Sequence, residues 1–327
     1  MSGIETLGSE PQLDLYAKLY RSLYRIRRME EEIVRLYPTD KIKSPVHLSI
    51  GQEAVCVGVC EALRLDDVVF GTYRSHALYL AKGGDIRQMA AELAGKATGC
   101  CKGKGGSMHL CDVAAGIMGT SAVVATTIPQ AVGYAYAVKL RRSDTIVVSF
   151  FGDGAVEEGV WHESMNYAKL KQLPILFVCE NNLYAIHARF ADRQPADNIC
   201  DRVRAYGIPA ERIEGNDIIR MHDSTRRVAA EIRNGAAGPY FLECMTYRWK
   251  EHVGPGEDWD FGYRSRAEAE PWIGHDQLRR IGQHLDPAVR SQIEEASEVE
   301  VRDAFDFAES SPFPDLAELY TDVIKGS

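Results

Sequence analysis

The stretch from Ala125 to Tyr247 constrains the fold most, because short apolar runs alternate with helical segments along it. TIVVSFF and PILFVCE are apolar throughout, and the helical segment VEEGVWHESMNYAKLK separates them. Strands without a polar face are typical of a parallel sheet covered on both sides. The alternation continues with ERIEG, DIIRMHDSTRRVAAEIRNG and YFLECMTY. We therefore predict an α/β fold with a doubly wound, mostly parallel sheet.

The N-terminal part of the chain is predicted to be helical. Apolar residues recur at helical intervals from Leu13 to Tyr37, where Pro38 stops the pattern, so one long amphipathic helix is expected. A second helix is expected from Gly51 to Leu63. The segment Gly95 to His109 is too rich in glycine for a regular element and is predicted to be a loop.

From about Ser265 the sequence becomes charged and helical, and it ends with PFPDLAELY as an expected docking tail. We therefore divide the chain into two parts. Residues 1–264 form the α/β domain with its N-terminal helical arm, and residues 265–327 form a C-terminal helical extension.

Composition excludes several classes of protein. With 38 basic and 47 acidic residues, the net charge of −9 lacks the basic excess of a nucleic-acid binder. The eight cysteines are scattered, mostly in apolar runs and without a CxxC pair, and are expected to be reduced core residues. MSGIETLGSEPQ lacks the pattern of a secretory signal, and no run reaches the roughly 18 apolar residues of a membrane helix. We expect a cytoplasmic protein that binds neither nucleic acid nor membrane.

Polar side chains follow two strands of the predicted sheet. Asp153 comes directly after TIVVSFF, and Asn181 and Asn182 come directly after PILFVCE. A right-handed helical crossover returns the chain beside its starting strand, so the two strand ends are expected to meet where open α/β sheets bind ligands. Carboxylate and carboxamide oxygens suit Mg²⁺, whose shell is completed by phosphates and water. The pattern predicts a magnesium diphosphate site.

The residues around Asp153 agree with such a site. Gly152 and Gly154 would let the backbone approach the phosphates, and the amides of Gly154 and Ala155 would point at them from the start of a helix. Taken alone, GDG or ENN could equally be an ordinary tight turn.

Seven motifs occur in order from about Tyr16 to the C-terminal region: GQEAVCVG, TYRSHALYLAKGG, GKGGSMHL, IPQAVGYAYA, GDGAVEEG, ENNLYAI and MTYRWKEHVGPG. In addition, GDG followed by 26 residues and then NN looks like the thiamine-diphosphate fingerprint. Together the motifs resemble the alpha subunits of the thiamine-diphosphate-dependent 2-oxo acid dehydrogenases, which include pyruvate, branched-chain and acetoin dehydrogenases. The resemblance implies the thiamine-diphosphate-binding fold, in its diphosphate-binding half.

The resemblance also assigns metal and cofactor ligands. It implies that Asp153, Asn182 and the backbone carbonyl of Tyr184 hold Mg²⁺. Tyr73 and Arg74 match the YR motif that contacts the cofactor, and the guanidinium fork of Arg74 suits diphosphate oxygens. The alternative for Arg74 is a surface ion pair.

Two histidines are implied to be catalytic. His76 and His252 match histidines that line the channel above the reactive thiazolium carbon, and His252 also counts as cofactor-binding. An imidazole there can orient the substrate carboxylate and pass a proton; without the resemblance, each would be an ordinary core or surface histidine.

Weaker assignments follow from the same motifs. The backbone at Ala122 and Val124 is implied to face the aminopyrimidine, and His109 to shape the rim of the cofactor cavity. His47 has no comparable context. His252 is not followed directly by the serine that kinase-regulated members carry, so no phosphorylation switch is expected. Lys250 and Glu251 also depart from the pattern of some members, which leaves substrate and acceptor open.

The glutamate that activates the cofactor lies on a second, beta subunit in this family, so the resemblance implies an α2β2 heterotetramer. The implied function is decarboxylation or cleavage of a 2-oxo acid or acetoin, with transfer of the acyl group to the lipoyl group of an acyltransferase. One alternative is a thiamine-diphosphate-dependent carboligase or transketolase-like subunit that uses a small-molecule acceptor. A nucleotide-binding module would need GxGxxG after the first strand or GxxxxGK followed by Ser or Thr, and neither is present. A non-catalytic scaffold is the remaining alternative.

Overall fold

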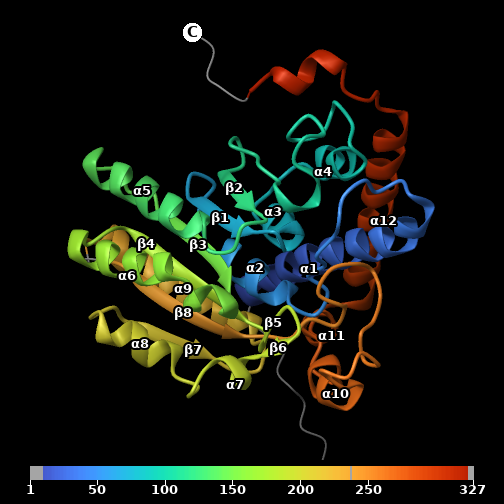
Figure 1. The fold of residues 1–327 in the computed structure, drawn as a ribbon. Coiled ribbons are helices and arrows are strands. Elements are labelled where there is room, and N and C mark those ends of the chain that lie inside the picture. The colour runs from blue at the N-terminus through green and yellow to red at the C-terminus, as the bar shows by residue number, and fades with distance from the viewer. Residues whose placement is uncertain (1–9, 236–237, 323–327) are drawn as a thin grey trace, which may run out of the picture.

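The computed structural model describes residues 10–235 and 238–322. Its centre is a parallel sheet of six strands in the order β2-β1-β3-β4-β8-β7 (Figure 1). These strands are β1 Val68–Thr72, β2 Ile117–Ser121, β3 Val147–Gly152, β4 Ile175–Asn181, β7 Ala210–Ile213 and β8 Tyr240–Met245. A short antiparallel pair, β5 Tyr184–Ala185 and β6 Ala188–Arg189, lies apart from the sheet. The predicted α/β class and parallel sheet are confirmed.

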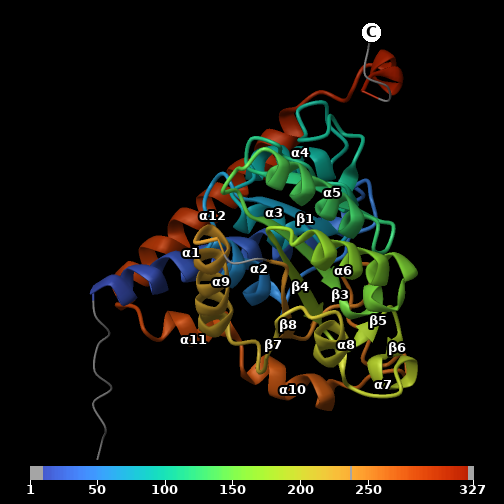
Figure 2. The same cartoon turned by 90° about the vertical axis from the view of Figure 1, so that its left-hand side faces the viewer.

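Helices cover both faces of this sheet (Figures 1 and 2). One face carries α1 Glu10–Leu36, α2 Glu53–Cys60, α3 His76–Ala81, α4 Ile86–Leu93, α9 Ile218–Arg233, α11 Gln277–Gly282 and α12 Pro287–Ser310. The opposite face carries α5 Thr127–Leu140, α6 Gly159–Lys171 and α8 Ile199–Ala205. The remaining helices are α7 Phe190–Arg193, α10 Arg266–Gly274 and the 3₁₀ turns η1 Tyr37–Thr39, η2 Gly106–Met108, η3 Asp153–Glu157 and η4 Leu316–Tyr320.

Side chains of the central strands alternate between two separate cores. Val148 and Phe150 of β3 pack with the core that contains α1, whereas Val147 and Phe151 pack with the core under α5 and α6. Successive residues of a strand point to opposite faces, so a strand between two cores must be apolar at every position. This is the physical reason for the unbroken apolar runs in the sequence.

The C-terminal helix α12 packs across α1, as Figures 1 and 2 show. Ile293 and Val301 of α12 belong to the same buried core as Leu19 of α1, and the Tyr20 hydroxyl donates a hydrogen bond of 2.5 Å to Glu294. The expected long N-terminal helix is confirmed. The division at residue 264 stays a prediction, although residues of α12 belong to the same buried core as α1.

Local structure departs from the sequence-based expectations in several places. Strand β2 was not expected. The chain after Asp153 forms a single 3₁₀ turn, η3, and the regular helix α6 begins only at Gly159. The expected loop Gly95–His109 is confirmed apart from the short turn η2.

The expected docking tail is exposed at its apolar positions, with Leu316 83% and Tyr320 82% accessible, and its docking role stays a prediction. The expectation about a secretory signal concerns mainly residues 1–9, which lie outside the described residues. No helix among the residues described is both long and apolar enough to cross a membrane.

Candidate functional site

A cavity of about 250 Å³ opens where β3 and β4 end. The two strands are neighbours, and Gly152 pairs with Glu180 in register, so Asp153 and Asn181 leave the sheet side by side. Asp153, Asn182 and Tyr184 line this cavity together. We call it the sheet-edge cavity, and the predicted meeting of the two strand ends is confirmed.

Asp153 is buried, with 1% of its surface accessible, and its two carboxylate oxygens differ. Oδ2 forms an ion pair with Arg193, whereas the buried Oδ1 has no hydrogen-bond partner among the described residues. Burial raises the pKa of the Asp153 carboxyl, and the Arg193 guanidinium partly offsets the rise. An oxygen in this state fits one coordination position of a divalent cation.

The Asn182 side chain is fixed by two hydrogen bonds. Its amide nitrogen donates to Oε1 of Gln52 at 2.9 Å, and its Oδ1 accepts from the backbone N–H of Tyr184 at 3.1 Å. A carboxamide oxygen has two lone pairs, so Oδ1 retains one for a cation. Gln52 lies in the motif GQEAVCVG, and this motif is the signal in the sequence from which the residue could have been predicted.

Arg74 also lines the cavity and is buried. Its guanidinium donates to the backbone carbonyls of Leu48 at 2.6 Å and His252 at 3.1 Å, and it forms no salt bridge within the described part of the chain. Burial, followed by repulsion from Arg248, lowers the pKa of Arg74 to about 10. The alternative of a surface ion pair is therefore wrong, and a buried cation without a carboxylate partner fits an anionic ligand.

His252 and Tyr73 stand next to Arg74 and form a ring cluster with His47. The His47 ring centroid lies 4.4 Å from that of Tyr73 and 5.0 Å from that of His252. Burial, with Arg74 next in size, lowers the pKa of each imidazole to about 3. Both imidazoles are therefore neutral near pH 7, and sequence reasoning missed His47.

Glu180 is a second acidic group of the cavity that the sequence analysis did not assign. It is the last residue before the Asn pair and is buried beside Cys56, whose thiol donates to Oε1 at 3.7 Å. Burial raises the pKa of Glu180 to about 7, although Arg74 acts in the opposite direction.

The structure does not place His76 at the sheet-edge cavity. Its ring is fully buried, Nδ1 lies 3.1 Å from a carboxylate oxygen of Glu30, and Nε2 lies 2.7 Å from the Ser107 hydroxyl. Both ring nitrogens are engaged away from the sheet-edge cavity, whose lining does not include His76. The side chain starts α3 and points into the core behind the YR turn, a direction that the motif TYRSH does not encode.

Other predicted backbone positions lie at the cavity as follows. Gly152, Gly154, Ala155 and Val124 line it, whereas Ala122 lies just beyond it on the same strand end. A Cβ at Gly152 would meet nothing within 4 Å, so the absence of a side chain keeps that side of the cavity open. The expectation that Gly154 and Ala155 stand at the start of an α-helix is wrong, because α6 begins only at Gly159.

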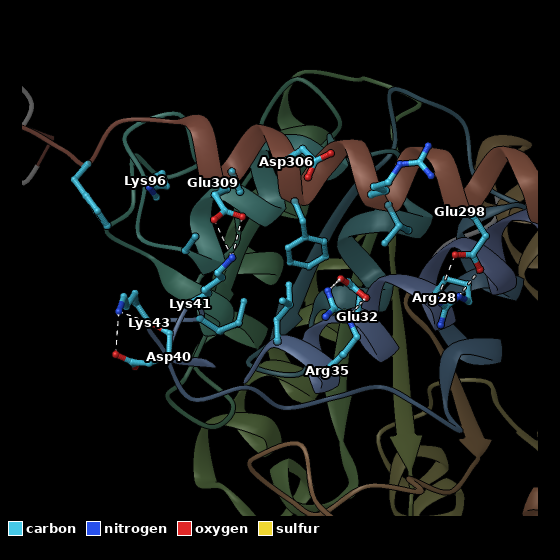
Figure 3. Close-up of a pocket in the computed structure, with 18 residues that line it drawn as sticks. Arg28, Glu32, Arg35, Asp40, Lys41, Lys43, Lys96, Glu298, Asp306 and Glu309 are labelled. Carbon is cyan, nitrogen blue, oxygen red and sulfur yellow. Dashed lines mark hydrogen bonds and ion pairs between the residues drawn. The ribbon is translucent and has the colours of Figure 1, made fainter. Parts of the chain in front are cut away.

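A larger cavity of about 650 Å³ lies elsewhere, between α1 and α12 (Figure 3). Its rim consists largely of ion pairs that are already formed, such as Arg28 with Glu298 and Lys41 with Glu309. The sheet-edge cavity is smaller but holds the cation without a carboxylate partner, the free carboxylate oxygen and the neutral imidazole. We therefore consider it the functional site.

A parallel α/β sheet with these groups at its carboxyl edge is typical of enzymes that bind a metal-bound phosphate ligand. The family described as the dehydrogenase E1 component matches residues 21–317, and the chain belongs to this family. Over 310 residues it is 37% identical to the alpha subunit of acetoin:2,6-dichlorophenolindophenol oxidoreductase of Bacillus subtilis, covering 93% of this chain and 92% of the relative. It is 34% identical over 322 residues to the pyruvate dehydrogenase E1 component alpha subunit of Rickettsia bellii, covering 96% and 97%.

Proposed function

We propose that the chain is the alpha subunit of a thiamine-diphosphate- and Mg²⁺-dependent dehydrogenase. The enzyme acts on a 2-oxo acid or acetoin and passes the acyl group to a lipoyl carrier. One observation carries the proposal: the free oxygen of buried Asp153, the Asn182 amide and the guanidinium of Arg74 converge on one cavity. The family membership and the alpha-subunit names of the relatives support it.

The metal and the diphosphate have separate ligands in this proposal. Asp153, Asn182 and the backbone carbonyl of Tyr184 hold Mg²⁺, which favours oxygen ligands. Arg74 neutralises the diphosphate, and Tyr73 contacts the cofactor beside it. The backbone at Gly152, Gly154 and Ala155 borders the diphosphate, and the backbone at Ala122 and Val124 borders the aminopyrimidine.

The bound cofactor supplies a thiazolium carbon that stabilises a carbanion. His252, neutral at pH 7, orients the substrate carboxylate by donating a hydrogen bond from one ring nitrogen. The role that we propose for His76 is to position the adjacent backbone through Glu30 and Ser107.

A second subunit completes the site in this proposal. Three apolar side chains at the cavity are exposed, with Val123 61%, Ile186 56% and Val124 46% accessible. An exposed apolar rim around a polar cavity favours cover by a partner protein. The alpha-subunit names of the relatives support a beta subunit, which we propose forms an α2β2 assembly and contributes the activating carboxylate, with a lipoyl acyltransferase as acceptor.

Replacing Asp153 with alanine tests the metal site. With the beta subunit present, Asp153→Ala should abolish Mg²⁺-dependent retention of thiamine diphosphate, because the metal loses its only proposed acidic ligand from this chain. Circular dichroism and calorimetric titration of the cofactor check fold and binding. Unchanged cofactor affinity in a folded variant would mean that the metal is held elsewhere.

A further inference from the structure

The cysteines fall into two groups, which corrects the expectation that they are all core residues. Five are buried: Cys56, Cys60, Cys179, Cys200 and Cys244. The other three, Cys100, Cys101 and Cys111, are half-buried and lie in or just after the glycine-rich loop Gly95–His109. These thiols lie away from the sheet-edge cavity, and the proposed function gives them no role.

A buried carboxylate anchors this loop. Glu92, at the end of α4, accepts hydrogen bonds from the backbone N–H groups of Cys101 at 2.8 Å, Gly103 at 2.9 Å, Gly105 at 2.7 Å and Gly106 at 3.0 Å. All of its lone pairs in the carboxylate plane are thereby used. Glu92 therefore acts on its surroundings as a fixed negative charge, and a cation next to it is favoured.

The two adjacent thiols lie beside that charge. The sulfurs of Cys100 and Cys101 and a carboxylate oxygen of Glu92 are all within 4.8 Å of one another. The hydrogen bond from Cys100 lowers the pKa of the Cys101 thiol, whereas that of Cys100 is raised. The loop lysines do not compete for this place, because Lys102 and Lys104 pair with Asp322 in the C-terminal tail.

Geometry decides between a disulfide and a metal bridge. Consecutive Cα atoms are about 3.8 Å apart, below the usual Cα separation of about 4.4 to 6.8 Å across a disulfide. A disulfide between Cys100 and Cys101 would therefore be strained. Two zinc–sulfur bonds of about 2.3 Å span up to about 4.6 Å between sulfurs, which a pair of adjacent cysteines can reach.

A buried hydroxyl lies beside the Cys100 sulfur. Tyr79 of α3 is fully buried, and its hydroxyl has no hydrogen-bond partner among the residues that the structure describes. Burial raises the pKa of Tyr79, and the neighbouring Cys100 sulfur adds to the rise. A phenol that donates to a metal-bound thiolate would satisfy this hydroxyl, because metal ligands are commonly held by such donors.

We propose that Cys100 and Cys101 form a binding site for a thiophilic divalent cation of the Zn²⁺ or Cd²⁺ type. Each thiol releases its proton to solvent, and two metal–sulfur bonds form without any change of oxidation state. Two thiolates neutralise the ion, Glu92 adds an uncoordinated negative charge, and water completes the shell. Both cysteines are half-buried, so the ion enters from solvent.

A cation at this site would hold the loop in place and, through it, part of the cavity wall. Ser107 in the loop holds the His76 ring, and the Thr120 hydroxyl of β2 donates to the backbone carbonyl of Leu110 at 2.9 Å. Strand β2 leads directly to Val123 and Val124 at the sheet-edge cavity. The metal site is therefore structural, and it is separate from the proposed Mg²⁺ site.

Cadmium titration of the full-length chain tests the proposal. We expect one equivalent of Cd²⁺ to produce an ultraviolet sulfur-to-cadmium charge-transfer band that is lost in Cys100→Ser and in Cys101→Ser. Cys111→Ser is the matched control, a third half-buried thiol from the same region, and should keep the band. A wild-type chain without the band, or a band that survives both substitutions, overturns the proposal.

A second measurement needs no variant. Cd²⁺ at ten times its dissociation constant should slow alkylation of Cys100 and Cys101 about tenfold, by mass action, and leave the rate at Cys111 unchanged. Peptide mass spectrometry locates the modified thiols. Equal alkylation rates at Cys100 and Cys101 with and without Cd²⁺ would contradict the site even if every variant misfolds.

Discussion

Arg74 is a buried charge whose partner is not found in the described part of the chain. An ionised group without a counter-charge costs free energy in a folded protein, and one that remains buried is commonly held for a ligand. Its hydrogen bonds to the carbonyls of Leu48 and His252 fix the guanidinium beside the cavity but do not neutralise it. The buried charge of Arg74 therefore lowers the stability of the folded chain, and the same charge provides a binding site for an anion.

Arg74→Gln should therefore separate binding from stability. We expect thiamine diphosphate affinity, with the beta subunit present, to fall by about 10- to 100-fold, because a charged hydrogen bond contributes about 1.5 to 3 kcal/mol. The free energy of unfolding of the isolated chain should change much less than the affinity, because removal of the buried charge offsets the loss of the hydrogen bonds to Leu48 and His252. Arg64→Gln is the control, because Arg64 pairs with Asp144 on the surface. A stability loss without a loss of affinity would contradict the assignment.

His47 gives a prediction about pH. Its pKa falls from 6.5 to about 3 on folding, so between these values the unfolded chain binds more protons than the folded chain. Stability from this residue is therefore fully present above pH 6.5 and is lost as the pH falls toward 3. In His47→Asn, the free energy of unfolding should fall less steeply between about pH 7 and pH 5. Urea titrations at several pH values measure the slope, and an unchanged slope would show that His47 titrates normally.

His76 and His47 show how much of the site could be predicted from the sequence at the scale of single residues. The residue types needed at the strand ends could be predicted, because Asp153 and Asn182 follow apolar strands directly. The direction of a side chain at a turn could not, because it depends on distant partners. His76 turns toward Glu30 of α1, whereas His47, which had no motif role, packs against Tyr73.

At the scale of elements, the start of α2 depends on one glycine. Gly51 has φ +98°, and a Cβ there would lie 2.5 Å from the carbonyl oxygen of Tyr247 and also clash with Trp249. Gly51 precedes Gln52, which holds the Asn182 amide, so its backbone positions a proposed metal ligand.

Gly51→Ala should destabilise the chain by about 3 kcal/mol or more, through backbone strain together with overpacking. Gly83→Ala is a matched control, because Gly83 has φ +97° and a Cβ there would meet nothing within 4 Å. It should show only the cost of strain, about 1 to 2 kcal/mol. Denaturant unfolding compares the two variants. Equal losses would mean that the contact with Tyr247 contributes nothing.

Elements were predictable where a strand lies between two cores. The units β3, α6 and β4 follow from apolar runs on either side of a helical segment, because both strand faces are covered. Strand β2 was missed because IMGTS is short, contains a glycine and lies at the edge of the sheet. The sequence also could not predict that the loop Gly95–His109 has a fixed conformation, because the loop is held by one carboxylate on the preceding helix.

At the scale of the whole molecule, charges are already paired across the cavity between α1 and α12, whereas the sheet-edge cavity is open and holds groups without a partner. Ion pairs such as Arg25 with Glu300 join the two helices over an apolar core. By contrast, the cavity has a polar floor and an exposed apolar rim that includes Val123 and Ile186. The open side is therefore where a second subunit would add the groups that this chain lacks.

Substitution at the apolar rim of the sheet-edge cavity tests whether a second subunit binds there. Val123→Asp should reduce coassembly with the beta subunit by at least about tenfold in affinity, because an unpaired carboxylate would have to be buried in the interface. Leu65→Asp is the control, because Leu65 is 88% exposed and is not part of the cavity lining.

The same variants test turnover. The isolated chain should show no decarboxylation. Adding the beta subunit should restore Mg²⁺-dependent turnover for wild type and Leu65→Asp but not for Val123→Asp. Sedimentation velocity measures assembly and substrate consumption measures turnover. Full activity of the isolated chain would contradict a shared site, because every group needed for the reaction would then have to lie on this chain.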